Sequence, residues 1–348
     1  MDKNLNTLLI LRLLATFAVV IGHAASFFGA FDFTQWPHSP YLQSMAVTIF
    51  FAVSGFTIAW VIDTRQSVGF LRFAYDRYMR LAIPLLPVLS LFWIVEALLY
   101  RAEHPYPGSL SVNVFLGNLA LLQNMAGFDT PPFGTNRALW TISVEYWIYI
   151  AYGGALLGLR HRSIGALALA LLAVVLLVPY VSGGRGDGLP MVWLAGAGLY
   201  HLLKNVDTIP NSGLLIVMPA LALNAYLLGS QSFWPSGGEF SPLYNIQLFA
   251  LFALLMLAGM TIQFPKWIMK GAVKAGACAY TIYLSHYPIQ EALWKFDVLG
   301  SGTKAALVAT GISIAAGWAL SLPFEQRYKG IRDKIARLLS EFAKLWGR

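Results

Sequence analysis

The chain has 348 residues, of which 57% are hydrophobic and only 11% are charged, and its formal net charge is +8. Soluble domains contain about 25% charged residues, so this composition excludes a soluble protein and predicts one whose surface faces lipid. The basic residues lie between apolar stretches and at the C-terminus, with no aromatic-lined basic groove, which excludes nucleic-acid binding.

Stretches long enough to cross a bilayer as a helix, about 20 apolar residues, recur along the chain. They predict an all-α, polytopic membrane protein of about ten transmembrane helices. The expected spans are 6–29, 42–62, 81–100, 138–158, 163–181, 189–203, 210–229, 242–263, 275–293 and 304–322. Lys and Arg are concentrated in the loops that would share a side with the N-terminus, so both termini are expected to be cytoplasmic.

The first span contains Arg12 and His23, two ionisable residues that a purely structural apolar helix would avoid. They are separated by about three helical turns, so their side chains project from nearly the same face, roughly 16 Å apart along the axis. Such residues usually face the protein interior or a wet cavity. Arg12 could instead extend to the inner interface, and His23 could be a hydrogen-bonded core residue, but their alignment favours a function.

Arg72, Arg77 and Arg80 precede the third span, on the side predicted to be cytoplasmic. A guanidinium group binds phosphate through a planar fork of donors, so this cluster is a candidate site for a nucleotide-bearing cofactor. The alternative is a loop that contacts anionic lipid, and these residues alone favour that alternative.

The outer segment between the third and fourth spans contains an apolar stretch, Val112 to Met125, that is too short to cross a membrane. It predicts one re-entrant or interfacial helix. This helix could cover a cavity or could be a plain surface helix, and the sequence leaves the two equal.

The fourth span carries Glu145 about two turns from its outer end, and His23 lies about as far from the outer end of the first span. A carboxylate at this depth could hold the imidazole in one tautomer and raise its basicity, which prepares a general base. Alternatively, Glu145 pairs with an arginine and holds two helices together. In the ninth span, Tyr283 and His286 could bind a polar substrate or could form a hydrogen-bonded helix contact beside the kink of Pro288.

The tail after residue 323 predicts a basic amphipathic helix on the inner membrane surface, because apolar residues recur every three or four positions between Ile331 and Leu345 with Arg and Lys between them. We therefore divide the chain into a transmembrane domain, 1–323, and a cytoplasmic tail, 324–348. The single cysteine, Cys278, excludes an intrachain disulfide, and the scattered histidines predict no metal site.

These motifs together resemble those of the membrane-bound acyltransferase 3 family, and the resemblance covers essentially the whole chain. The matching segments are the Arg-ten-residues-His pattern of Arg12 and His23, FFAVSGF at 50–56, the arginine-rich entry to the third span at 77–84, and LWTISVE at 139–145. Thr141, Tyr146 and Ser285 depart from the family's usual residues, and the resemblance therefore supports the family assignment more than it supports any specific acceptor.

The resemblance implies a multi-pass O-acyltransferase of the inner (plasma) membrane. Acyl-CoA, most simply acetyl-CoA, would bind from the cytoplasm through Arg72, Arg77, Arg80 and Arg12. His23, oriented by Glu145, would deprotonate a hydroxyl of a carbohydrate or lipid-linked saccharide, and Arg12 would stabilise developing negative charge.

The acceptor is expected to contact Trp140, Ser143, Tyr283 and His286. A transporter or flippase of a saccharide or lipid-linked intermediate, with the same polar residues along its path, is the alternative from a different functional class.

Overall fold

The computed structural model describes residues 2–31, 41–182, 186–206, 210–229, 240, 242–262 and 264–346. Within these ranges the chain forms helices and loops and no β-strand. The α-helices are α1 (Asp2–Phe28), α2 (Leu42–Thr64), α3 (Phe70–Tyr100), α4 (Val112–Leu119), α5 (Trp140–Arg160), α6 (Ile164–Leu176), α7 (Leu189–Leu203), α8 (Asn211–Gly229), α9 (Pro242–Thr261), α10 (Lys266–Gly276), α11 (Ala279–Lys295), α12 (Thr303–Ser321) and α13 (Tyr328–Trp346). The short 3-10 helices are η2 (Arg101–Glu103), η3 (Arg137–Leu139) and η4 (Val178–Tyr180).

The all-helical prediction is confirmed, and each expected span has a helix in its place. This agreement has a physical cause: in lipid every backbone amide needs an internal hydrogen-bond partner, and a helix supplies those partners within one segment. Among the described helices, six are long and apolar enough to cross a membrane: residues 5–28, 42–64, 70–100, 137–160, 243–261 and 303–321. The count of about ten crossings and the side of the termini stay predictions.

Three segments differ from the expected boundaries. α3 begins at Phe70 rather than at residue 81, so the arginine cluster lies on a helix and not in a loop. The helix of the outer segment, α4, ends at Leu119, because the backbone of Leu121 and Asn124 adopts positive φ angles of 59° and 57°. α10 is a separate helix that the sequence reading did not anticipate.

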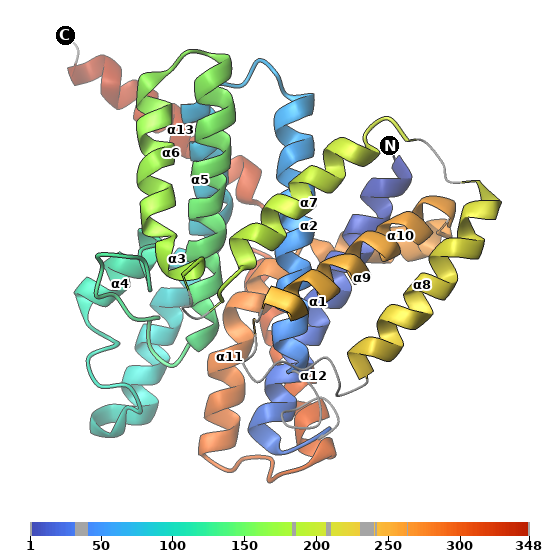
Figure 1. Ribbon diagram of the computed structural model, residues 1–348. Coiled ribbons are helices and arrows are strands. Elements are labelled where there is room, and N and C mark those ends of the chain that lie inside the picture. The colour runs from blue at the N-terminus through green and yellow to red at the C-terminus, as the bar shows by residue number, and fades with distance from the viewer. Residues whose placement is uncertain are drawn as a thin grey trace.

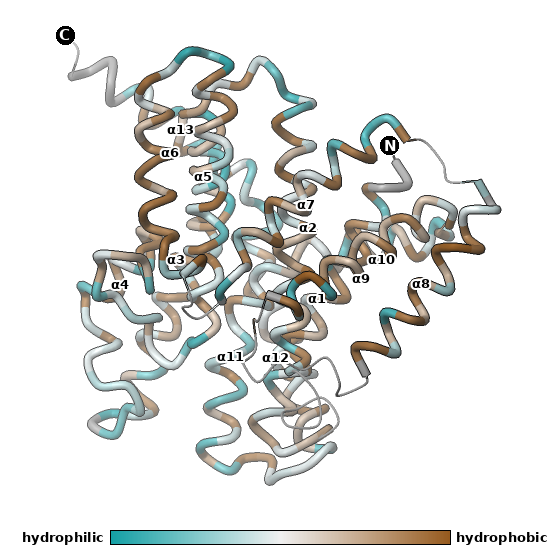
Figure 2. The backbone as a smooth tube through the Cα atoms, viewed as in Figure 1, coloured by the Kyte–Doolittle hydropathy of each residue, from teal (hydrophilic) through white to brown (hydrophobic). Residues whose placement is uncertain are grey.

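The helices pack in neighbouring pairs around α1 and α2. α2 packs against α7, α5 against α6, α11 against α12, and α1 against α2, α11 and α12. Figure 1 shows α5 beside α6, α7 lying diagonally across α2, and both chain ends in the upper half of the view. Figure 2 shows hydrophobic residues along most of α6 and hydrophilic residues at the turn between α5 and α6. This pattern is typical of helices whose flanks face lipid and whose ends face water.

Two glycines let α2 and α7 approach at backbone distance. A Cβ atom on Gly55 would lie 1.9 Å from the carbonyl oxygen of Trp193, and one on Gly196 would lie 2.1 Å from the carbonyl oxygen of Ala52. Only residues without a side chain permit this contact, as in other tightly packed membrane helices. The contact also fixes the position of Ser54, the neighbour of Gly55, which lines a cavity among α1, α2, α3, α5 and α11.

Candidate active site

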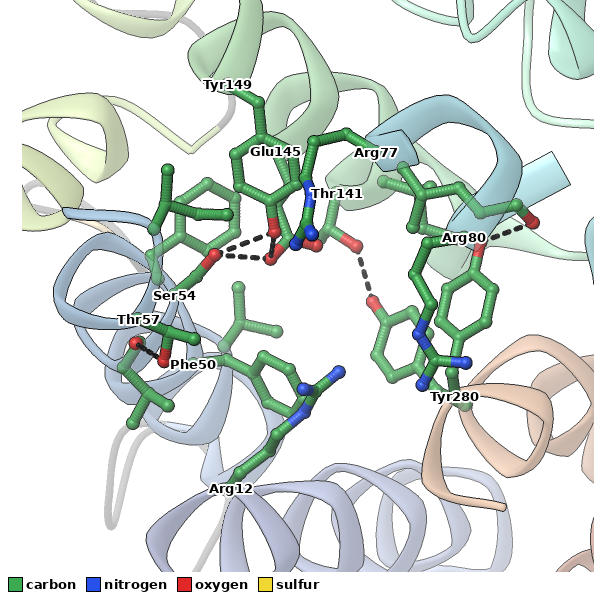
Figure 3. A pocket seen from close by; sticks show the side chains of 17 residues that line it. Arg12, Phe50, Ser54, Thr57, Arg77, Arg80, Thr141, Glu145, Tyr149 and Tyr280 are labelled. Atoms are coloured by element: carbon green, nitrogen blue, oxygen red, sulfur yellow. Dashed lines mark hydrogen bonds between the residues drawn. The ribbon is translucent and has the colours of Figure 1, made fainter. Parts of the chain in front are cut away.

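A cavity of about 110 Å³, here called the arginine cavity, lies among α1, α2, α3, α5 and α11. Its polar lining includes Arg12, Ser54, Arg77, Arg80 and Glu145. Figure 3 shows the guanidinium groups of the three arginines directed into the hollow from different sides. Residues separated by more than a hundred positions in the sequence therefore meet in one place.

Arg12 and Arg77 are held as potential donors toward this cavity. The Nε atoms of both side chains are buried and have no hydrogen-bond partner. The Arg12 guanidinium lies 5.6 Å from the centroid of the Phe50 ring, and that of Arg77 lies 5.9 Å from the centroid of Phe73. Buried polar atoms in proteins are almost always paired, so these donors indicate a site for a ligand with acceptor oxygens.

Arg80 is fixed by a buried carboxylate that the sequence reading did not single out. Its Nη2 donates to Oε1 of Glu325 at 2.9 Å, and its guanidinium lies 4.7 Å from the centroid of the Tyr328 ring. The Glu325 side chain is fully buried and also accepts hydrogen bonds from the backbone N and Oγ1 of Thr281, both at 2.8 Å. Glu325 thus links α3 to the start of α11. In the sequence, the only indication of this role was an isolated acidic residue just after the last apolar helix.

Arg72 does not line the arginine cavity. Its exposed side chain pairs with Asp76, one turn along α3, at 3.2 Å. At 3.6 residues per turn, Arg77 and Arg80 share a face of the helix, whereas Arg72 points about 140° away from Arg77. The expected cluster of three arginines is therefore divided by the helical form of this segment.

Glu145 is bound by two hydroxyl groups inside the arginine cavity. Ser54 Oγ donates to its Oε1 at 2.7 Å, and the hydroxyl of Tyr149 donates to the same oxygen at 2.5 Å. Trp193 Nε1 in turn donates to Ser54 Oγ at 3.3 Å. The sequence reading included Ser54 only as part of a motif and missed Tyr149, although its spacing of four residues from Glu145 places both on one helix face.

His23 lies in a second hollow, here called the histidine cavity, of about 410 Å³. Its Nδ1 is 3.0 Å from Nε2 of His286, and Nδ1 of His286 is 2.7 Å from the carbonyl oxygen of Tyr283. A carbonyl only accepts, so neutral His286 carries its proton on Nδ1 and accepts at Nε2 from Nδ1–H of His23. This chain of hydrogen bonds leaves the basic lone pair of His23 on Nε2.

The expected contact between Glu145 and His23 does not form, because the two residues line different cavities and Glu145 bonds to Ser54 and Tyr149. Equal depth along two helices does not make the helices neighbours. α5 packs mainly against α3 and α6, whereas α1 packs against α2, α11 and α12. The partner of His23 is His286 on α11, which the depth of residues within their spans could not identify.

The remaining expected acceptor contacts divide between the cavities and the core. Trp140 and Tyr283 line the histidine cavity, and the buried ring of His286 contacts His23 behind it. Ser143 is fully buried and lines neither cavity. Its hydroxyl oxygen lies 2.8 Å from the carbonyl oxygens of both Gln123 and Trp140, so in this structure it holds the loop after α4 against α5.

The family model described as an acyltransferase domain matches residues 6–322 of the chain. O-acetyltransferase OatA of Staphylococcus aureus is 22% identical over 316 residues, covering 80% of this chain and 49% of the relative. Acyltransferase MdmB of Streptomyces mycarofaciens is 28% identical over 194 residues, covering 52% of this chain and 49% of the relative. The chain thus spans about half the length of these curated relatives, and no solved structure matches it.

Proposed function

The chain belongs to the acyltransferase 3 family, and on this premise we propose that it is an integral-membrane O-acyltransferase of the inner (plasma) membrane. It transfers an acyl group, in the simplest case acetyl, from acyl-CoA to a hydroxyl of a carbohydrate or lipid-linked saccharide. The observation that carries this proposal is the buried, unpartnered Nε of Arg12 and of Arg77 in a cavity that adjoins the one containing His23.

The arginine cavity accepts the acyl-thioester end of the donor. By the measure in which one water molecule needs about 10 to 15 Å³, a volume of about 110 Å³ leaves room for a slender chain of atoms. The phosphates of the donor would bind outside it, where Arg80 also borders a hollow lined by Arg327 and Lys329. Arg72 would act only as an exposed cation toward the same end of α3.

His23 acts as the general base from the histidine cavity. Its Nε2 takes the proton of the acceptor hydroxyl, and the oxygen attacks the thioester carbonyl carbon. The carbon–sulfur bond then breaks, and the departing thiolate takes up the proton held by His23. His286 orients the imidazole in this scheme, and Arg12 stabilises the negative charge that develops on the carbonyl oxygen.

Glu145 has a different role in this proposal from the one expected for it. Its hydrogen bonds to Ser54 and Tyr149 place one carboxylate among the arginines. It partly balances their positive charge while the donor is absent.

The proposal is tested by incubating the purified protein in lipid vesicles with isotope-labelled acetyl-CoA and candidate saccharide acceptors. We expect an acylated product by mass spectrometry and an equal amount of released thiol. His23→Ala should lower the rate at least about 10²-fold, which is the lower range for loss of a general base. The exposed His161→Ala variant is the matched control.

Normal transfer by His23→Ala would contradict the assignment of the base. Saccharide movement across the vesicle membrane without acyl-CoA, together with no thiol release for any acceptor, would instead support the transporter alternative.

A further inference from the structure

The arginine cavity and the histidine cavity share three lining residues: Val47, Thr141 and Tyr283. Each comes from a different helix, namely α2, α5 and α11. Residues that line both cavities form the wall between them, so the two hollows meet at this set and are separated by it. We call these three residues the partition.

Each of the four helices around the partition lines the arginine cavity on one side of it and the histidine cavity on the other. On α1, Arg12 lines the first cavity and His23 the second, about three turns apart. On α5, Glu145 lines only the first cavity and Trp140 only the second, with Thr141 between them. The same order holds on α2 and α11. The cavities are therefore stacked along the helix axes, on opposite sides of the partition.

A hydrogen bond closes the partition. The hydroxyl oxygens of Thr141 and Tyr283 are 2.6 Å apart, and both also lie 3.1 Å from the carbonyl oxygen of Ala138. Each hydroxyl has one proton, so one of them donates to the other and the second donates to the carbonyl. Every proton of the pair is thus used within the partition. Figure 3 shows the Thr141 contact as the dashed line that crosses the hollow toward a tyrosine.

We propose that Thr141 and Tyr283 are the pair that separates the donor from the acceptor and decides between acyl transfer and hydrolysis. The acyl carbon of a donor in the arginine cavity and the hydroxyl of an acceptor in the histidine cavity can meet only at this wall. While the pair is hydrogen-bonded, water from the acceptor side does not reach the thioester. An acceptor that displaces the pair exposes the thioester to its own hydroxyl.

If the wall is removed, water attacks the acyl carbonyl carbon, the carbon–sulfur bond breaks, and the thiol leaves with one proton while the acyl group becomes a free acid. The identities of donor and acceptor rest on the proposed function, but the wall itself does not. It can be tested without any acyl donor.

The direct test measures access from each side of the membrane. Thr57, which lines only the arginine cavity, is changed to Cys in a Cys278→Ala background, because Cys278 is the single native cysteine. A membrane-impermeant thiol reagent is applied to vesicles of defined orientation. With the partition intact, we expect labelling from the face nearest Arg80 and at least ten-fold less from the opposite face.

Adding Tyr283→Ala should raise labelling from the opposite face at least ten-fold. Tyr283→Phe and Thr141→Ala, which remove few atoms and should fold normally, are expected to give intermediate increases. Tyr226→Ala, at an exposed tyrosine on α8, is the matched control and should change nothing. Equal labelling from both faces with the pair intact, or no increase in all three variants, would overturn the proposal.

The activity test uses acetyl-CoA without an acceptor. Thiol release by the Tyr283→Ala protein should exceed that of the unsubstituted protein at least ten-fold. When acceptor is added, the ratio of acylated product to thiol should be lower for Tyr283→Ala than for the unsubstituted protein. If the unsubstituted protein turns over no acyl-CoA with any acceptor, the proposed function fails, and the labelling experiment still decides whether the partition exists.

Discussion

The close approach of α2 and α7 predicts a measurable loss of stability for Gly55→Ala. The new Cβ would lie 1.9 Å from the carbonyl oxygen of Trp193, whereas ordinary contact begins at 3.4 Å, so the helices must separate by about 1.5 Å. Both atoms belong to or are attached to backbone, so no side chain can rotate away. Overpacking of this kind costs about 1 to 3 kcal/mol, and here the higher value applies because two helices must move.

The same displacement reaches the candidate active site. Ser54 precedes Gly55 and donates to Glu145 at 2.7 Å, while Trp193 donates to Ser54 at 3.3 Å. A shift of about 1.5 Å carries the second of these contacts beyond hydrogen-bonding distance. We therefore expect Gly55→Ala to lose both stability and donor binding.

The assay is thermal unfolding in detergent or lipid, followed by titration of acetyl-CoA into the folded protein. Gly198→Ala is the control, since it adds the same methyl group to α7 at a position with no atom within 4 Å. It should leave stability unchanged or raise it, because alanine is favoured over glycine in a helix. Equal stability and equal donor affinity of the two variants would refute the close-contact reasoning.

Glu325→Gln should lower the free energy of unfolding by about 3 kcal/mol, because it leaves the largely buried Arg80 without its charge partner. Chemical or thermal unfolding measures this, and Lys204→Gln, at the more exposed pair with Asp63, is the control expected to cost less than about 1 kcal/mol. His286→Ala should reduce kcat at least about ten-fold with little change in the KM for acetyl-CoA, because it orients the base and lies away from the donor; a rise in KM alone would contradict this role. Arg12→Lys should raise the KM for acetyl-CoA more than it lowers kcat, since lysine keeps the charge but loses the planar fork; steady-state kinetics that leave KM unchanged would argue against donor contact.

The two cavities explain why ionisable residues are retained inside apolar helices. Arg12 and His23 would each be costly if they faced lipid. In the structure, Arg12 lines one cavity and His23 the other, at opposite sides of the partition. The first span thus contributes one residue to each half of the proposed reaction.

The local features of the chain were predictable from sequence because they depend on near neighbours. The apolar stretches predicted a helix at each expected span, and the amphipathic pattern after residue 323 predicted a helix where α13 lies. The segment with Ser54 and Gly55 contributed only to the family resemblance. The structural role of Gly55, which is the close approach of α7, is revealed only by the packed structure.

The sequence by itself determined the membrane class, the helices and the family resemblance, because hydropathy and short motifs are read along one segment at a time. Only the tertiary structure decided that His23 bonds to His286, that Glu145 bonds to Ser54 and Tyr149, and that Arg72 lies outside the cavity. The physical reason is that these outcomes depend on which helix faces of distant segments meet. Neither the depth of a residue in its span nor its distance along the chain contains that information.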